Sequence, residues 1–334
     1  MRGMISFCGQ TANEVWIEAA RRLLHQEEHK SSRLGPTREL LHAAFSITDS
    51  QQKWVTSRIP TINPAFALAE LVWIVNGARE AKIINYWNPI LPKYAGNGDN
   101  YHGAYGYRIF HHFGLDQLTR AYLTLKNKSE SRQVVIQIWD SKIDFPDDAG
   151  QPIDMDIPCN ICSMVKVKNG KLEWSQILRS NDIFLGVPHN FVQFTGLQEI
   201  LAGWLDIEVG SYVQYSDSLH LYEKDADKIN FSSADSEKNT DSLALNKVQS
   251  EKNFKLIYEN MKKLMDPGIK KADFMRTLDL KCKHRAFENI MLVIGADAAR
   301  RKGWGKESED IMSMCDNPVY QQLWNGWFAR KMAM

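Results

Sequence analysis

One short segment carries an unusual density of side chains that can bind or react. The sequence RSNDIFLGVPHN contains Arg179, Ser180, Asp182 and Asn190 between an apolar stretch before it and another after it. A solvated loop would explain the polar residues, but it would not explain why buried elements frame them. Polar groups at such a junction tend to face a ligand pocket.

A second candidate is Cys159, which follows Pro158 after an acidic, proline-containing loop. A reactive cysteine needs a lowered pKa, and Arg179 is a candidate for the positive charge that lowers it. The alternative is a small buried hydrophobic residue. Cys159 and Cys162 do not predict a metal site, because residues three apart on a strand face opposite ways and no second pair follows.

Two further positions have the right chemistry for proton transfer and for sugar binding. Glu70 stands inside the apolar run AFALAELVWIV, so it is either a surface residue or a desolvated carboxylate with a raised pKa. His220 and Tyr222 alternate in DSLHLYEKD and would share one face of a strand, where they would either bind a hydroxyl group or pack together.

The elements that must position these residues follow from hydrophobic spacing. Helices are predicted over residues 12–28, 65–75, 115–127, 191–205, 253–265, 284–301 and 308–333. Strands are predicted over 43–48, 134–139 and 212–215, and a hairpin joins 164–167 to 172–178 through Asn169-Gly170. Residues 29–40 read as a loop. The pattern indicates an α/β (α+β) core over 1–229, a polar linker over 230–252 and a helical C-terminal region over 253–334.

Bulk composition excludes some classes of partner. A net charge of +1 and the lack of a basic stripe argue against nucleic acid, and no apolar run is long enough for a membrane span. Five scattered cysteines and a polar N-terminal stretch favour the cytoplasm.

Taken together and in this order, the motifs resemble the thymidylate synthases and the related pyrimidine-nucleotide hydroxymethylases. The similarity runs from about residue 33 to residue 222, and its most specific part is LRSNDIFLGVPHN with Pro-Cys upstream and HLY downstream. The resemblance implies a mixed sheet with surrounding helices. It also implies transfer of one carbon from 5,10-methylenetetrahydrofolate, as co-substrate and without a metal, to C5 of a pyrimidine nucleoside monophosphate in a homodimer with shared active sites.

The resemblance also assigns roles to matching residues. The catalytic set would be Cys159, which adds to C6 of the ring, with Glu70, Tyr105, Asn190 and Asp182. The nucleotide would be bound by Arg33, Arg132 (from the partner subunit), Arg179, Ser180, Asn160, His220 and Tyr222. The folate would be bound by Trp87, Asp182, Gly186 and His189.

Several positions depart from the synthase pattern, mainly around the base and the folate. Asn160 replaces the usual histidine, Gln133 a second arginine, His189 a phenylalanine and Asp140 an asparagine, and the phosphate loop and C-terminal tail also differ. A synthase must exclude water from its methylene intermediate, and a polar histidine makes that harder. The sequence therefore favours hydroxymethylation over methylation. Uracil and cytosine, and ribose and deoxyribose, remain open. A non-catalytic homologue would be expected to lack the cysteine or the glutamate.

Overall fold

The structure, a computed structural model, describes residues 3–26, 29–32, 35–231, 236–282 and 284–332. Within these residues, seven strands form one mixed sheet in the order β1-β3-β8-β7-β6-β5, with β2 also paired to β3. The strands are β1 (Ile5–Gly9), β2 (His29–Lys30), β3 (Thr37–Ile47), β5 (Val135–Gln137), β6 (Asn160–Lys168), β7 (Lys171–Asp182) and β8 (Glu208–Tyr222). The pairs β1–β3 and β7–β8 are parallel, and the others are antiparallel. A separate short pair joins β4 (Arg58–Ile59) to β9 (Asn230–Phe231).

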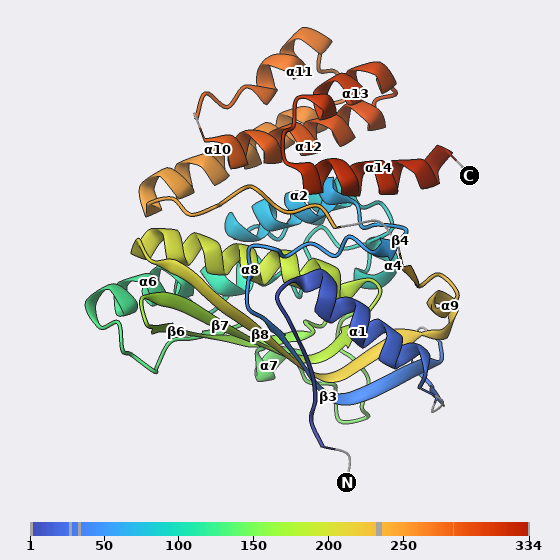
Figure 1. Ribbon diagram of the computed structural model, residues 1–334, viewed down its shortest axis with the longest axis vertical. Coiled ribbons are helices and arrows are strands. Elements are labelled where there is room, and N and C mark those ends of the chain that lie inside the picture. Colours follow the sequence, from blue (N-terminus) through green and yellow to red (C-terminus); the bar gives the residue numbers. More distant parts are fainter. Residues whose placement is uncertain (1–2, 27–28, 33–34, 232–235, 283, 333–334) are drawn as a thin grey trace.

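Helices are stacked in layers over one face of this sheet (Figure 1). α1 and α8 pack on the strands, α2 lies against α8, and α10 and α12 lie against α2. The core helices are α1 (Ala12–Leu24), α2 (Pro64–Val75), α3 (Ala81–Trp87), α4 (Pro92–Ala95), α5 (Tyr105–Tyr107), the π-helix η1 (Arg108–His112), α6 (Gln117–Asn127), α7 (Ser141–Asp144), α8 (Gly186–Leu205) and α9 (Glu223–Ala226). The C-terminal helices are α10 (Lys247–Met265), α11 (Lys271–Leu278), α12 (Arg285–Arg301), α13 (Gly305–Ser313) and α14 (Pro318–Met332).

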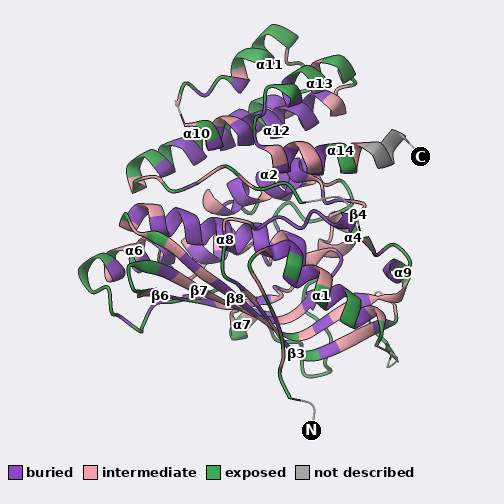
Figure 2. Ribbon diagram, in the orientation of Figure 1, coloured by how far each residue is buried: buried purple, intermediate pink, exposed green. Residues whose placement is uncertain are grey.

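The apolar composition of α2 follows from its place between two layers. It packs on α8 on one side and on α10 and α12 on the other, so nearly every side chain is buried (Figure 2). Asn63 caps its first turn, accepting hydrogen bonds from the N–H groups of Ala65 and Phe66. Glu70 is the only charged residue of this helix, so any acid–base chemistry in this layer falls to it.

Several predicted elements are confirmed, as is the mixed α/β class with its helical C-terminal region. Thr11 caps α1, and its side chain accepts from the N–H of Glu14. The β6–β7 hairpin turns at Asn169 and Gly170, whose φ angles of 52° and 74° are those of the turn that favours this dipeptide.

Other predicted boundaries are wrong, and the sheet explains most of them. Residues 37–40 are not loop but the start of β3, where Thr37 pairs with Tyr222. β8 runs over Glu208–Tyr222 instead of residues 212–215. The strand is longer because β3 pairs with it on one side and β7 on the other. Its polar residues give no sign of these hydrogen-bond partners. β5 is shorter than predicted, since it pairs on one side only.

α8 begins at Gly186, before the predicted start at Phe191. Asp182 accepts hydrogen bonds from the N–H groups of Phe184 and Leu185 just ahead of the helix, at 2.7 and 3.2 Å. Pro188 is tolerated because the first turn of a helix has no intrahelical use for its missing N–H. His189 and Asn190, at the end of RSNDIFLGVPHN, therefore lie within α8, whereas residues 179–182 end β7.

The region after residue 229 also differs from the prediction. The segment taken as a linker is packed where the structure describes it: Asn239 bonds to Gln51 and Gln52, Leu243 is buried, and α10 already begins at Lys247. The single helix expected over residues 308–333 is divided into α13 and α14, because Pro318 can start a helix but not continue one. Within the described residues, no helix is both long and apolar enough to cross a bilayer.

Candidate active site

A cavity of about 610 Å³ opens where α2, the start of α8 and the ends of β7 and β8 meet the segment before β6. Its size is within the range typical of small-molecule sites, roughly 300–1,000 Å³. Most of the residues singled out in the sequence line it: Glu70, Tyr105, Cys159, Arg179, Ser180, Asp182, Gly186, His189, Asn190, His220 and Tyr222. They come from segments far apart in the chain, so the fold brings them together.

Three of the expected site residues that the structure describes are not on the cavity wall of this chain. Trp87 is buried in the core, with its carbonyl accepting from Arg301. Asn160 is fully buried behind the wall and accepts from Gln176 at 2.9 Å. Arg132 is exposed in the loop before β5. Arg33 lies outside the described residues.

Arg179 holds the cysteine segment in place. Its Nε donates to the carbonyl of Pro158 at 3.0 Å and its Nη2 to that of Ile157 at 3.2 Å, while its backbone N–H bonds the carbonyl of Cys159. The guanidinium also lies over the ring of Trp139, at 5.5 Å from the centroid. Arg179 thus fixes the backbone of the segment that ends at Cys159.

Glu70 projects from α2 to the cavity, and the pKa of its carboxyl is close to neutral pH. Burial raises its pKa to about 7, although Gln193 Nε2 donates to its Oε2 at 2.6 Å and opposes the rise. A group with a pKa near the working pH both takes up and releases protons readily.

His189, in the first turn of α8, is a neutral neighbour of this carboxyl. Its Nδ1 is 3.7 Å from Glu70 Oε2, and its ring meets that of Phe66 edge-on at 4.9 Å. Burial lowers the pKa of His189 to about 3, so the ring carries no charge at neutral pH. Nδ1 has no hydrogen-bond partner among the described residues, so this polar group can bind water or ligand.

At the far end of β7 and β8, the register pairs Asp182 directly with His220. Burial raises the pKa of Asp182 and lowers that of His220, because each charged form is poorly solvated there. The rings of His220 and Tyr222 are on one face of β8, as their alternation predicted, and meet edge-on with centroids 5.2 Å apart. Asn190 is held by its amide nitrogen, which donates to Asn181 at 3.0 Å.

Two acidic residues of the cavity wall could not be singled out from the sequence: Asp154, which is exposed, and Asp156, which is partly buried. The Oδ2 of Asp156 accepts from the N–H of Gly103 at 2.8 Å, and burial raises the pKa of Asp156 to about 6. Negative charge at Asp156, at Cys159 and at Glu70 raises the pKa of Tyr105, although burial of the phenol is the larger cause. The only signal for Asp156 in the sequence was an acid three residues before the cysteine, which is indistinguishable from the other acids of that loop.

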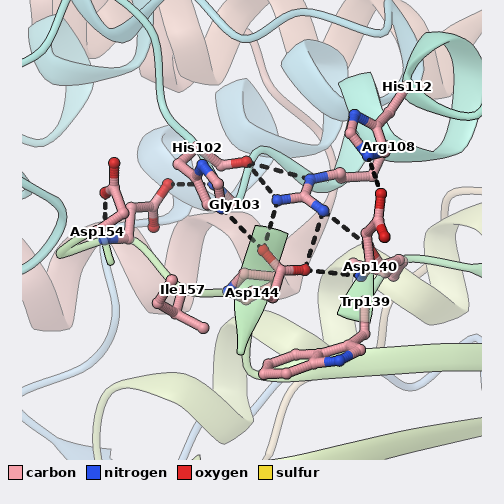
Figure 3. A network of polar contacts seen from close by, with 12 residues as sticks. His102, Gly103, Arg108, His112, Trp139, Asp140, Asp144, Asp154 and Ile157 are labelled. Atoms are coloured by element: carbon pink, nitrogen blue, oxygen red, sulfur yellow. Dashed lines mark hydrogen bonds and ion pairs between the residues drawn. The ribbon is translucent and has the colours of Figure 1, made fainter. Parts of the chain in front are cut away.

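A buried ion-pair network supports the Gly103 side of the cavity (Figure 3). Arg108, only 1% exposed, donates to both oxygens of Asp144 at 3.0 and 2.8 Å and twice to the carbonyl of His102 at 3.1 and 3.0 Å. His102 Nε2 lies 2.8 Å from Asp144 as well. The network fixes the backbone immediately before Gly103, at the edge of the site.

Comparisons with known proteins agree on one family. The family model described as Thymidylate synthase matches residues 14–266. A deoxyuridylate hydroxymethyltransferase of Bacillus phage SP01 is 28% identical over 233 residues, covering 66% of this chain and 60% of the relative. Its counterpart in Pseudomonas phage M6 is 31% identical over 169 residues (50% and 47%), and a putative thymidylate synthase of Methanothermobacter marburgensis is 38% identical over 120 residues (36% and 51%). The chain thus spans about half to three fifths of the length of these relatives.

Within the described residues, no three His, Cys, Asp or Glu side chains are grouped as a metal site would require.

Proposed function

Because the chain belongs to the thymidylate synthase family, we propose that it transfers a one-carbon unit from a folate to C5 of a pyrimidine nucleoside monophosphate. The observation that carries this proposal is the single cavity that Cys159, Glu70, Tyr105 and Arg179 share. A non-catalytic homologue would have no reason to keep a thiol, a near-neutral carboxyl and an arginine on one wall.

The residues of the cavity suit the stages of such a reaction. Cys159 adds to C6 of the ring, because a weakly electrophilic ring needs a soft nucleophile. The adduct makes C5 nucleophilic, and Tyr105 then assists loss of the C5 proton while Glu70 exchanges protons with the ring and ordered water. Arg179 and Ser180 bind the phosphate, and the positive charge of the arginine supports the thiolate.

The sugar and the base meet polar groups at the other end of the cavity. His220 and Tyr222, whose rings meet edge-on, present two hydrogen-bonding groups to the sugar. Asn190 can donate to and accept from the edge of a uracil, since its amide carries both kinds of group. Asn160, buried behind the wall, influences the base through its neighbours rather than by contact.

The cavity also fits a folate. Phe66, Trp73, Ile90 and Leu91 form an apolar wall suited to a flat ring system, and Gly186 leaves room at the start of α8. The carboxylate of Asp182 uses Oδ1 for two backbone N–H groups, so Oδ2 can accept from a pterin. When bound, the folate supplies the carbon at the oxidation level of formaldehyde. Trp87, buried behind this wall, would support it rather than touch it.

We infer hydroxymethylation of deoxyuridylate as the specific reaction. Its first support is that relatives from two phages are named deoxyuridylate hydroxymethyltransferases. Its second is the polar character of the cavity around the ring, where His189 takes the place of an apolar side chain. Because burial lowers the pKa of His189 to about 3, its ring is too weak a base to deprotonate a water molecule, but it can form a hydrogen bond with one.

A homodimer with shared sites is the proposed assembly. The sheet face opposite α8 carries a row of register neighbours, Val135, Met164, Ser175 and Val213, and the three apolar members are 53%, 37% and 37% exposed. A second copy on that face would cover this apolar surface. Arg132 lies three positions before Val135, the first residue of β5. It would thus stand at the rim of that face and reach the partner's phosphate.

The test is to identify both products. The full chain is incubated with methylenetetrahydrofolate and, in turn, dUMP, dCMP, UMP and CMP. We expect a hydroxymethyl nucleotide from dUMP and release of tetrahydrofolate, because no hydride leaves the folate. Stoichiometric dihydrofolate with a methyl nucleotide would replace the proposal with thymidylate synthesis, and no modification of any nucleotide would overturn it. His189→Phe should reduce hydroxymethyl product while the Cys159 adduct still forms.

A further inference from the structure

Asp156 is an acid of the cavity wall to which none of the stages above assigns a task. Within the described residues, its Oδ2 accepts one hydrogen bond, from the N–H of Gly103, and its Oδ1 accepts none. One carboxylate oxygen is therefore anchored while the other is available to the cavity. A single backbone anchor of this kind fixes direction without using up the acceptor capacity of the group.

The anchor is itself held rigidly. Arg108 donates twice to the carbonyl of His102, which precedes Gly103, and Asp144 holds Arg108 from the other side (Figure 3). A side chain at Gly103 would collide with the segment of Asp156, because a Cβ there would lie 2.6 Å from its carbonyl oxygen. Glycine at this position lets the two backbones approach closely enough for the hydrogen bond. The carboxylate is thus preorganised, as a catalytic group must be.

The position of Asp156 relative to the reacting atoms follows from its neighbours. It precedes Cys159 by three residues on the same wall, and its charge acts on Tyr105, the residue assigned to the C5 proton. It therefore belongs to the part of the cavity where C5 and its new carbon would lie. Glu70, which projects from α2, also raises the pKa of Tyr105.

Resting on the proposed hydroxymethylation, we propose that Asp156 accepts the proton of the water molecule that adds to the exocyclic methylene at C5. One O–H bond of water breaks, its proton goes to the Asp156 carboxylate, and the oxygen bonds to the methylene carbon. The electrons of the C5–methylene double bond move to O4 of the ring as an enolate. The enolate then reforms the C4 carbonyl and the C5–C6 double bond, and expels the Cys159 thiolate. The step is redox-neutral, and Asp156 later releases its proton to solvent.

The electrostatic surroundings suit this task. Burial and the nearby Asp154 raise the pKa of Asp156 to about 6, while the hydrogen bond from Gly103 and the charges of His102 and Arg108 oppose the rise. A carboxylate with this pKa is ionised at neutral pH and still basic enough to hold a proton in the transition state. His189 is not, because burial lowers its pKa to about 3.

The decisive variant is Asp156→Asn, whose amide oxygen still accepts from Gly103. The full chain is given dUMP, methylenetetrahydrofolate and 2-mercaptoethanol, and three quantities are measured: exchange of the C5 hydrogen, hydroxymethyl product and the thioether formed when the thiol captures the methylene. We expect exchange to persist and hydroxymethyl product to fall by about 10²-fold or more. The thioether should become the main product, because its formation from thiolate needs no base.

Two neighbouring acids complete the design. The ratio of hydroxymethylation to exchange should fall in wild type as pH drops through about 6, because Asp156 must be ionised. Asp154→Asn should move this fall in the ratio to lower pH, since the charge of Asp154 raises the pKa of Asp156. The control is Asp148→Asn, which makes the same charge change at an exposed position of the same loop that does not line the cavity. It should leave the pH at which the ratio falls unchanged.

The outcomes separate this inference from the function on which it rests. If wild type forms no hydroxymethyl nucleotide, the proposed function fails. If wild type forms it and Asp156→Asn does so at the same rate with the same product ratio, Asp156 is not the proton acceptor. Equal loss of exchange and of hydroxymethyl product in a folded Asp156→Asn protein would also overturn the inference, because it would indicate a role before water adds.

Discussion

Arg108 offers a sharp test of how the site is supported. The side chain is 1% exposed, and all of its hydrogen bonds go to Asp144 and to the carbonyls of His102 and Ile138. Arg108→Met keeps most of the volume but removes the charge. Asp144, whose side chain is 0% exposed, then keeps a buried negative charge without its principal partner.

The expected loss follows from that geometry. Removing one member of a buried ion pair costs about 3–5 kcal/mol, because the remaining charge is poorly solvated. His102 and the N–H of Asp140 still contact Asp144 and compensate in part, which favours the lower end of the range. Replacing Asp144 by Asn as well should recover much of the loss, since no buried charge then remains.

The loss should depend on pH with a definite sign. In wild type, hydrogen bonds from Arg108, Asp140 and His102 hold the pKa of Asp144 below its ordinary value despite burial, so its contribution is present above the unfolded pKa and is lost as pH falls through the folded one. In Arg108→Met, burial without the arginine would raise that pKa. The variant would take up a proton on folding, and the difference in free energy of unfolding should shrink as pH falls from 7 towards 4.

Urea unfolding of wild type, both variants and a control measures these quantities. The matched control is Arg276→Met, which breaks the exposed ion pair with Asp273 and should cost less than about 0.5 kcal/mol. A loss below about 1 kcal/mol for Arg108→Met, with an unchanged denaturant slope, would refute the reasoning that Asp144 depends on the arginine. Lack of recovery in the double variant would refute it as well.

Three further outcomes are expected. Cys159→Ala should abolish exchange of the C5 hydrogen while Cys162→Ala keeps most of it, measured by tritium release from a C5-labelled nucleotide; exchange in Cys159→Ala would contradict the covalent route. Mixing inactive Arg132→Ala and Cys159→Ala subunits should restore some activity, because one hybrid site is then intact, and no rescue despite demonstrated subunit exchange would argue against shared sites. Glu70→Gln should slow exchange by about 10²-fold and remove the inflection near pH 7. Glu70→Gln should also raise the free energy of unfolding above pH 7, because a carboxyl with a raised folded pKa loses stability as pH rises from its unfolded pKa to its folded one. If the inflection near pH 7 persists in the variant, it belongs to another group.

The chain order of the motifs was readable from the sequence because each motif carries its own chemistry. The chemistry of LRSNDIFLGVPHN and of Pro158-Cys159 depends on the types of their side chains, which can be read directly from the sequence. Local patterns also predicted α1, α2 and the β6–β7 hairpin, where capping residues, apolar spacing and a turn dipeptide act over a few neighbours. The lengths of β3 and β8 were not predictable in this way, because their hydrogen-bond partners are distant in sequence.

The environment of each site residue was decided only by the tertiary structure. The sequence marked Glu70 as an acid in an apolar run, but its pKa of about 7 depends on helices packed on both sides of α2 and on Gln193 from α8. Asp156 looked like one of several loop acids, and only the approach of Gly103 distinguishes it. Desolvation and anchoring depend on groups that meet in space, and no local pattern records which distant segments will meet.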